Sequence, residues 1–207
     1  MTNSLNYEYH NNLKNIKQMK ILVLDNYDSF TYNLVHYVEK ILNQKADVFR
    51  NDEILLEEVE KYDKIILSPG PGIPDEANML KPIIKEFGPK KSILGVCLGV
   101  QAIAEVYGGS LINLESVYHG VATTMQQAEP DECLFRDIPQ QFEAGRYHSW
   151  IVDRKSLPLC FKISSVDNNG QIMSIFHTSH NVRGVQFHPE SVLTPFGEKM
   201  IKNWLES

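Results

Sequence analysis

A single cysteine between two glycines is the residue of this sequence best placed to do chemistry. Cys97 lies in the stretch Gly95-Val96-Cys97-Leu98-Gly99, after an apolar run and before a pattern typical of a helix. A sharp strand–turn–helix connection of this kind presents a nucleophile at a helix N-terminus, where free backbone N–H groups favour a thiolate. The amide of Leu98 would then be placed as an oxyanion donor. The stretch alone is equally compatible with a small buried cysteine packed beside two glycines.

A thiolate nucleophile needs a base, and His188 is the candidate among the seven histidines. It follows the apolar run "GVQF", so we expect it at the end of a strand, where sites of α/β proteins gather. Glu190 points the same way in an extended segment, which Pro189 keeps non-helical. A carboxylate there would fix the imidazole tautomer and stabilise the imidazolium. Taken alone, the pair also fits a surface histidine beside a helix-capping glutamate.

A second glycine cluster, "LSPGPGIP", follows the apolar run "KIIL". Gly70 and Gly72 relieve the restriction that a Cβ imposes, while Pro69, Pro71 and Pro74 stiffen the loop. A plain tight turn accounts for these residues, and so does a rigid wall whose amides face a substrate carbonyl. The cluster is not a phosphate-binding loop, because no G-K-[ST] follows it.

The elements that must position these residues alternate in the first half of the chain. Apolar runs predict strands at 20–25, 46–50, 63–68 and 92–96, and helical spacing predicts helices at 29–42, 53–62, 77–87 and 98–107. Strands alternating with helices indicate a parallel sheet with right-handed crossovers. Asp28 and Ser29 are expected to cap the first helix.

The second half of the sequence has a different pattern of predicted elements. It predicts strands at 109–114, 116–126 and 182–187, and a hairpin over 161–178 around Asn169 and Gly170. A closing helix is expected with Thr194 as its N-cap and Pro195 as its first residue. The fold class is therefore α/β, a single domain with a mostly parallel central sheet flanked by helices and antiparallel strands added in the C-terminal half.

Composition narrows the functional class. The formal net charge is −6 and Lys and Arg form no run, which argues against nucleic acid or an anionic membrane as a partner. Cysteine is sparse, odd in number and free of C-x-x-C spacing, which favours a reducing cytoplasm over a disulfide framework. Residues 1–19 are polar, and we expect them to form an extension before a single domain that spans 20–207. No stretch of the sequence is long and apolar enough to cross a bilayer.

Other candidate groups are weaker. Cys133 and Cys160 have no paired base and are expected to be structural. His177 and His180 have no carboxylate or cysteine that completes a ligand set, so neither a metal site nor a cofactor is expected.

Taken together, the motifs resemble those of the class I, triad-type glutamine amidotransferases, of the anthranilate synthase component II kind. The matching stretches are "LDNYDSFTYNLV", "LSPGPGIP", "ILGVCLGVQAIAEVYGG", "YHG", "GRYHSW" and "RGVQFHPESVLTPFG". They occur in the family's order from Ile21 to the C-terminus. Each motif is modest alone, but the ordered set is specific.

The resemblance implies that Cys97 attacks the side-chain amide of L-glutamine and that ammonia leaves from a glutamyl thioester. His188 would act as base and then acid, and Glu190 would orient it. The amides of Gly70 and Leu98 would form the oxyanion hole.

The resemblance also assigns a glutamine pocket. Gly70, Pro71 and Gly72 would line it, and Gln101, Ser149 and Trp150 match positions that hold the glutamine head group in relatives. Taken as isolated residues, these last three also fit an exposed helix position, a turn hydroxyl and a core aromatic.

The family further implies a partner, a chorismate-using synthase subunit of the anthranilate synthase component I type, to which ammonia passes. The alternatives are the glutaminase subunit of aminodeoxychorismate synthase, a Cys-His hydrolase of γ-glutamyl compounds or peptides, and a non-catalytic binding module. One position departs from the family pattern G-x-C-x-G-H-Q, because Val100 replaces the histidine. It lies outside the triad, so we expect it to affect packing behind the elbow or contact with a partner.

Overall fold

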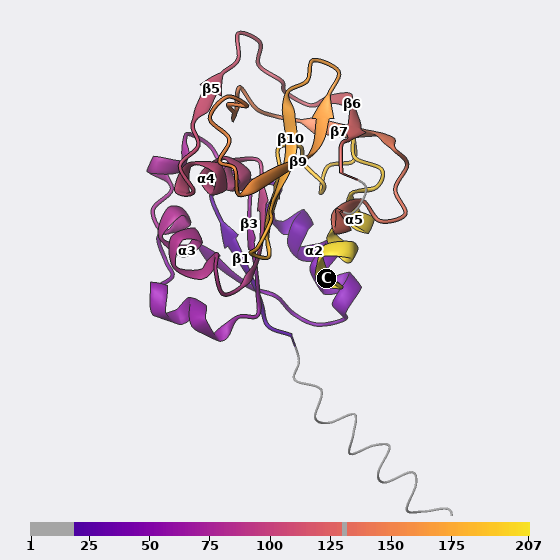
Figure 1. The fold of residues 1–207 in the computed structure, drawn as a ribbon. Coiled ribbons are helices and arrows are strands. Elements are labelled where there is room, and N and C mark those ends of the chain that lie inside the picture. The colour runs from indigo at the N-terminus through magenta and orange to yellow at the C-terminus, as the bar shows by residue number, and fades with distance from the viewer. Residues whose placement is uncertain (1–18, 130–131) are drawn as a thin grey trace, which may run out of the picture.

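The computed structural model describes residues 19–129 and 132–207, so the expected extension over 1–19 lies, Met19 apart, outside the described residues. A nine-stranded sheet runs through the domain in the order β2-β1-β3-β4-β11-β10-β9-β6-β7 (Figure 1). Its first five strands are parallel: β2 (Asp47–Arg50), β1 (Ile21–Asp25), β3 (Lys64–Leu67), β4 (Ser92–Val96) and β11 (Val182–Val185). This is the parallel half that the alternating pattern predicts.

The remaining strands of the sheet are antiparallel to their neighbours. They are β10 (Ile172–His177), β9 (Phe161–Asp167), β6 (Val121–Gln127) and β7 (Gln141–Arg146). Two short strands, β5 (Leu111–Asn113) and β8 (Trp150–Val152), pair separately beside the large sheet. The predicted α/β fold with antiparallel additions in the C-terminal half is thereby confirmed.

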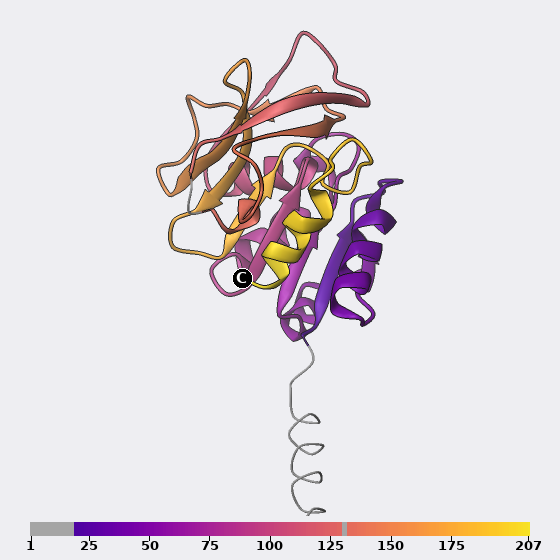
Figure 2. The same cartoon turned by 90° about the vertical axis from the view of Figure 1, so that its right-hand side faces the viewer.

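Helices cover both faces of the parallel half, which explains why its central strands are apolar throughout. Figures 1 and 2 show α2 (Thr31–Leu42) beside α5 (Gly197–Leu205) on one face. The helices α3 (Leu80–Phe87) and α4 (Leu98–Val106) lie on the other. Side chains alternate between the two cores along each strand, so that Val23 packs toward α2 and Leu24 toward α3. Short 3-10 turns are η2 (Leu56–Lys61), η3 (Pro74–Glu76) and η4 (Cys133–Phe135).

The two helices for which an N-cap was predicted begin elsewhere in the structure. Helix α2 begins at Thr31 with no side-chain cap, because Asp25 closes the preceding turn by accepting from the Tyr27 amide at 3.0 Å and the Thr31 hydroxyl at 2.8 Å. Asp28 and Ser29 are therefore not its caps. Helix α5 begins at Gly197, and the Thr194 hydroxyl makes long-range hydrogen bonds instead of capping it.

Three further expectations are corrected. The segment 53–62 contains the six-residue 3-10 turn η2 instead of an α-helix; Val59 of the turn is buried, and so are the flanking Ile54 and Tyr62. Residues 116–120 precede β6 and are not part of that strand. The strands β7 and β8 were not predicted, because "QFEAGR" mixes polar with apolar residues and "WIV" is very short.

The glycines around Cys97 allow α4 to lie close against the sheet. A Cβ on Gly95 would stand 2.5 Å from the carbonyl carbon of Gly99, and one on Gly99 would stand 2.6 Å from the Leu67 carbonyl oxygen. Side chains at either position would push α4 away from β3 and β4. The turn that carries Cys97 therefore depends on both glycines.

This contact predicts the effect of Gly95→Ala. The added methyl group forces α4 outward, so we expect the free energy of unfolding in urea to fall by about 1–3 kcal/mol. The exposed-site substitution Leu159→Ala is the control and is expected to leave it unchanged, because Leu159 is fully exposed. Equal stability of the two variants would show that the close approach is not required.

Candidate active site

Cys97 occupies a strained turn between β4 and α4. Its backbone has φ 51° and ψ −99°, a conformation that non-glycine residues adopt rarely and mostly at functional sites. The Cys97 amide donates to the Val185 carbonyl at 2.8 Å, and its own carbonyl accepts from the Gln101 amide at 3.2 Å. Leu98 is the first residue of α4, so its amide has no acceptor within the helix. The turn therefore holds the sulfur beside free backbone donors.

His188 and Glu190 form a buried pair next to Cys97. The His188 Nδ1 donates to the Glu190 Oε1 at 2.6 Å, and both side chains are almost completely enclosed. The backbone of His188 is fixed on both sides, because its amide donates to the Gly145 carbonyl at 2.9 Å and its carbonyl accepts from the Thr194 hydroxyl at 2.6 Å. The structure thus brings together the three residues predicted as a triad.

The charge state of His188 follows from its neighbours. Burial by itself would lower the pKa of His188, but hydrogen bonding and charge from Cys97 and Glu190 raise that pKa well above the ordinary 6.5. The Nε2 atom is buried and makes no hydrogen bond of regular geometry with any described residue, so it is the nitrogen left to exchange a proton with the sulfur. The arrangement favours an imidazolium beside the Cys97 sulfur.

A small pocket of about 160 Å³ opens beside the sulfur. Every predicted substrate-binding residue except Leu98 lines it, together with two residues that were not predicted; the lining is Gly70, Pro71, Gly72, Cys97, Gln101, Tyr147, His148, Ser149 and Trp150. The Leu98 side chain is buried in the core, so the role predicted for this residue depends on its backbone amide alone. Gln101 is 3% exposed and faces the interior, so it is not an exposed helix residue.

Buried asparagines hold the loop that carries Gly70. The Asn26 amide donates to the Ser68 hydroxyl at 2.9 Å, and its side-chain nitrogen donates to the Ser68 carbonyl at 2.8 Å. Asn51 in turn donates to the Asn26 side chain at 3.0 Å. These bonds join the loops after β1, β2 and β3 at the carboxyl edge of the sheet and fix the wall of the pocket.

The opposite wall rests on a buried arginine. Arg146, 1% exposed, pairs with Asp167 at 2.7 Å and donates through Nε to the His148 Nε2 at 3.1 Å. Burial first, and then the charges of Arg146 and His188, lower the pKa of His148 to about 3. His148 is therefore neutral at physiological pH and holds the 147–150 segment as an uncharged hydrogen-bonding group.

A wider cavity of about 390 Å³ lies on the outer side of Cys97. Tyr147 lines both cavities; its ring centre lies 4.7 Å from that of His188, and its hydroxyl shares a hydrogen bond with Ser191 at 2.9 Å. The wall of this outer cavity includes the segment 27–30 and His119, to which the sequence assigned no role. The quoted motif "LDNYDSFTYNLV" therefore contributes its residues 27–30 to the edge of the site.

Four residues of the site were not predicted: Arg146, Tyr147, His148 and Gln186. Gln186 lies one residue beyond β11 and directs its Nε2 at the Cys97 sulfur at 3.5 Å. The only signal for it in the sequence was a polar residue inside the apolar run "GVQF". Arg146, Tyr147 and His148 lay within a quoted motif, but nothing in their spacing separated them from a loop.

The remaining candidates lie elsewhere. His177 and His180 stack on each other at 4.1 Å, and Tyr107 bonds to His180. Within the described residues no three His, Cys, Asp or Glu side chains are grouped to hold a metal ion. Cys133 and Cys160 are free thiols outside both cavities, and Cys133 contacts Arg183.

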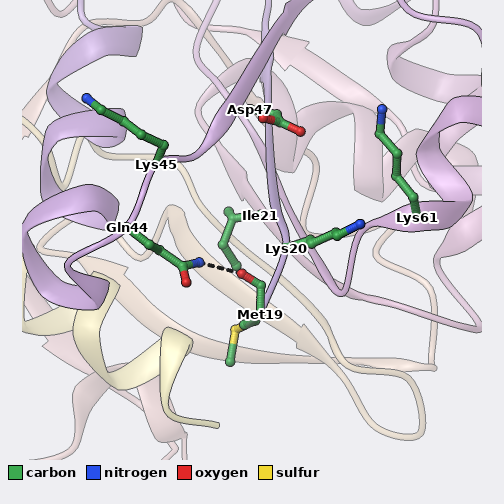
Figure 3. A pocket seen from close by; sticks show the side chains of 7 residues that line it. All are labelled: Met19, Lys20, Ile21, Gln44, Lys45, Asp47 and Lys61. Atoms are coloured by element: carbon green, nitrogen blue, oxygen red, sulfur yellow. Dashed lines mark hydrogen bonds between the residues drawn. The ribbon is translucent and has the colours of Figure 1, made fainter. Parts of the chain in front are cut away.

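A hollow of about 380 Å³ at the opposite edge of the sheet lacks these features (Figure 3). It is lined by Lys20, Lys45, Lys61 and neighbours at the start of β1, and Figure 3 shows Lys45 and Lys61 on opposite sides of it. It holds no nucleophile and base together. Within residues 19–129 and 132–207, none of the helices combines the length and the apolar character needed to cross a bilayer.

Val100, the departure from the family pattern, is part of the packing behind the elbow. It is buried in α4, and a Cβ on Gly184 of β11 would lie 2.5 Å from its Cγ2. The valine therefore fills the space over a glycine in the strand next to β4. This agrees with the expected effect on packing behind the elbow.

Comparison with known proteins places the chain among amidotransferases. A family model described as "Glutamine amidotransferase class-I" matches residues 22–207. The chain is 43% identical over 189 residues to the aminodeoxychorismate/anthranilate synthase component 2 of Bacillus subtilis, covering 90% of this chain and 96% of that protein. It is 40% identical over 192 residues to the anthranilate synthase component 2 of Pseudomonas aeruginosa, covering 89% and 94%.

A solved structure shares the fold. The crystal structure of a protein from Thermoplasma acidophilum, described as a putative GMP synthase subunit, superposes with a TM-score of 0.81 at 25% sequence identity. The alignment covers 91% of this chain and 93% of that one.

The lowered pKa of His148 predicts a pH-dependent contribution to stability. The imidazole of His148 takes up a proton near pH 6.5 in the unfolded chain but only near pH 3 in the folded chain. The contribution of neutral His148 to the free energy of unfolding is therefore complete above pH 6.5 and is lost as the pH falls toward 3. Between pH 7.5 and 5, wild type should lose about 2 kcal/mol more unfolding free energy than His148→Gln.

Urea unfolding at the two pH values measures this difference. His36→Gln, at an exposed position, is the control and should follow wild type. Parallel pH dependence of wild type and His148→Gln would contradict the neutral buried state of His148.

Proposed function

Because the chain belongs to the class-I glutamine amidotransferase family, we propose that it is the glutaminase subunit of anthranilate synthase, which makes ammonia for a chorismate-using synthase subunit in tryptophan biosynthesis. The observation that carries the proposal is the position of Cys97. Its sulfur lies between a small pocket lined by the predicted glutamine-binding residues and the buried His188–Glu190 pair. The catalytic domain is proposed to span residues 20–207.

In the proposed reaction the Cys97 thiolate attacks the side-chain carbonyl carbon of L-glutamine. The negative charge that forms on the carbonyl oxygen is stabilised by the amides of Gly70 and Leu98. His188 Nε2 donates its proton to the leaving nitrogen, the C–N bond breaks, and ammonia and a glutamyl thioester result. His188 then removes a proton from water, which attacks the thioester and releases glutamate and the thiolate. Glu190 holds the imidazole in the required orientation throughout.

The pocket supplies the binding groups for this substrate. Gly70, Pro71 and Gly72 form its rigid wall, while Gln101, Ser149 and Trp150 face the head group of the amino acid. A volume of about 160 Å³ favours one small polar molecule over a peptide chain. This supports glutamine over the peptide-hydrolase alternative.

The outer cavity supports a partner subunit. It opens from Cys97 toward the segment 27–30, where Tyr27 is half exposed and held by a hydrogen bond to Asp52 at 2.8 Å. We propose that the synthase subunit covers this face and receives the ammonia, since ammonia released to water would be lost. The three free cysteines support a reducing compartment, which we take to be the cytoplasm.

A second function, the glutaminase subunit of aminodeoxychorismate synthase, is favoured by the double name of the Bacillus subtilis relative. The two functions differ in the synthase partner and not in the glutaminase chemistry. Product analysis after adding each kind of synthase subunit, with chorismate and glutamine, separates them. Formation of aminodeoxychorismate alone would assign the chain to that enzyme.

The Cys97→Ser variant tests the proposal in the complex with a synthase subunit. Anthranilate formation from chorismate and glutamine should fall by at least about a thousand-fold, because the hydroxyl is a far weaker nucleophile than the thiolate. Formation from chorismate and ammonium salts should persist, because the synthase is intact. Cys133→Ser and Cys160→Ser are matched controls that should retain both activities; glutamine-dependent synthesis by Cys97→Ser would disprove the proposed nucleophile.

A further inference from the structure

A buried glutamine beside the sulfur has no part in the triad. Gln186 is 1% exposed, and its backbone amide is held by the Met173 carbonyl at 2.8 Å. Its side-chain nitrogen lies 3.5 Å from the Cys97 sulfur, and its side-chain oxygen lies 3.3 Å from the Gln101 Nε2. The side chain therefore spans the space between the pocket residue Gln101 and the nucleophile.

The direction of this amide is determined by a chain of hydrogen bonds. The Trp150 carbonyl can only accept a hydrogen bond, and it accepts one from the Gln101 Nε2 at 2.8 Å. The side-chain amide of Gln101 must therefore direct its NH₂ group, and not its oxygen, toward Trp150. The second hydrogen of that group then requires an acceptor, which is the Gln186 oxygen. Gln186 in turn must present its NH₂ group to the sulfur. Reversal of Gln186 would place two NH₂ groups against each other and an oxygen against the thiolate.

We propose that Gln186 is a hydrogen-bond donor to the Cys97 thiolate, held in place by Gln101 and the Trp150 carbonyl. This inference rests on the proposed role of Cys97 as nucleophile. The bond stabilises the charged sulfur from the side away from the outer cavity, and His188 stabilises it from the other. Because the Gln101 NH₂ group is used by Trp150 and Gln186, its Oε1 is the atom left to accept from the bound substrate. A hydrogen bond from the substrate to this oxygen would polarise the chain of amides that ends at the sulfur.

The alternative is that Gln186 only fills space between β11 and α4. The two roles differ in their effect on the pH dependence of thiol reactivity. A space-filling residue changes stability but not the pH at which Cys97 becomes nucleophilic. A donor to the thiolate changes that pH.

Alkylation of the isolated chain by iodoacetamide tests the inference. The rate at Cys97 is followed by mass spectrometry of its peptide as a function of pH. In Gln186→Met, which keeps the approximate volume but removes the donor, the pH of half-maximal rate should rise by about one unit. Gln186→Glu, which keeps the shape and the acceptor for Gln101 but turns an oxygen to the sulfur, should raise it at least as far.

Gln127→Met is the matched control. Gln127 is also a buried glutamine, and its Nε2 donates to the carbonyls of Ile138 at 3.0 Å and Pro139 at 2.8 Å, away from the site. Its substitution should leave the Cys97 midpoint unchanged. An unchanged midpoint in folded Gln186→Met or Gln186→Glu would overturn the inference.

A measurement on the wild type covers the case in which neither variant folds. The side-chain amide resonances of Gln186 should move with the same pH midpoint as Cys97 alkylation, and resonances that do not move would overturn the inference. The proposed function fails by a different result, namely that wild-type Cys97 reacts no faster than Cys133 and Cys160.

Discussion

The close approach of α4 to the ends of β3 and β4 determines the rest of the site. Because Gly95 and Gly99 have no side chains, the helix backbone lies against the Leu67 carbonyl, and the chain must turn within one residue. Cys97 takes the strain of that turn, with a φ of 51°. Hydrogen bonds at the amide and carbonyl of Cys97 hold its backbone in this conformation. The direction of the side chain is therefore fixed, and the free amides at the start of α4 lie next to the sulfur.

The two halves of the fold supply different parts of the chemistry. The parallel half carries Cys97, the proposed nucleophile, and, through Asn26 and Ser68, the wall of the small pocket. The antiparallel half carries β7, whose Gly145 holds the backbone of His188. The last parallel strand, β11, lies beside β4 and brings His188 close to the sulfur. The antiparallel strands are therefore part of the site, since β7 holds the backbone of His188, the proposed base.

The sequence predicted what depends on local pattern and missed what depends on distant contacts. The apolar runs and the glycines around Cys97 were enough for β1, β3, β4 and α4. Thr194 was assigned as a helix cap, but its hydroxyl bonds to Gly145, 49 residues away, and to His188. The role of Gln186 could not be predicted, because it depends on the pairing of β11 with β4, the strand that precedes Cys97. The hydrogen-bonding partners of Arg146 and His148 likewise come together only in the fold.

In the proposed mechanism, the neighbouring imidazole of His188 makes the Cys97 sulfur reactive in a pocket that binds glutamine. A chloroketone analogue of glutamine, followed by mass mapping of the labelled peptides, tests it most directly. We expect one label, on Cys97, that free glutamine prevents and that forms far more slowly in His188→Gln. Labelling of Cys133 or Cys160 instead, or equal labelling of Cys97 in wild type and His188→Gln, would contradict it.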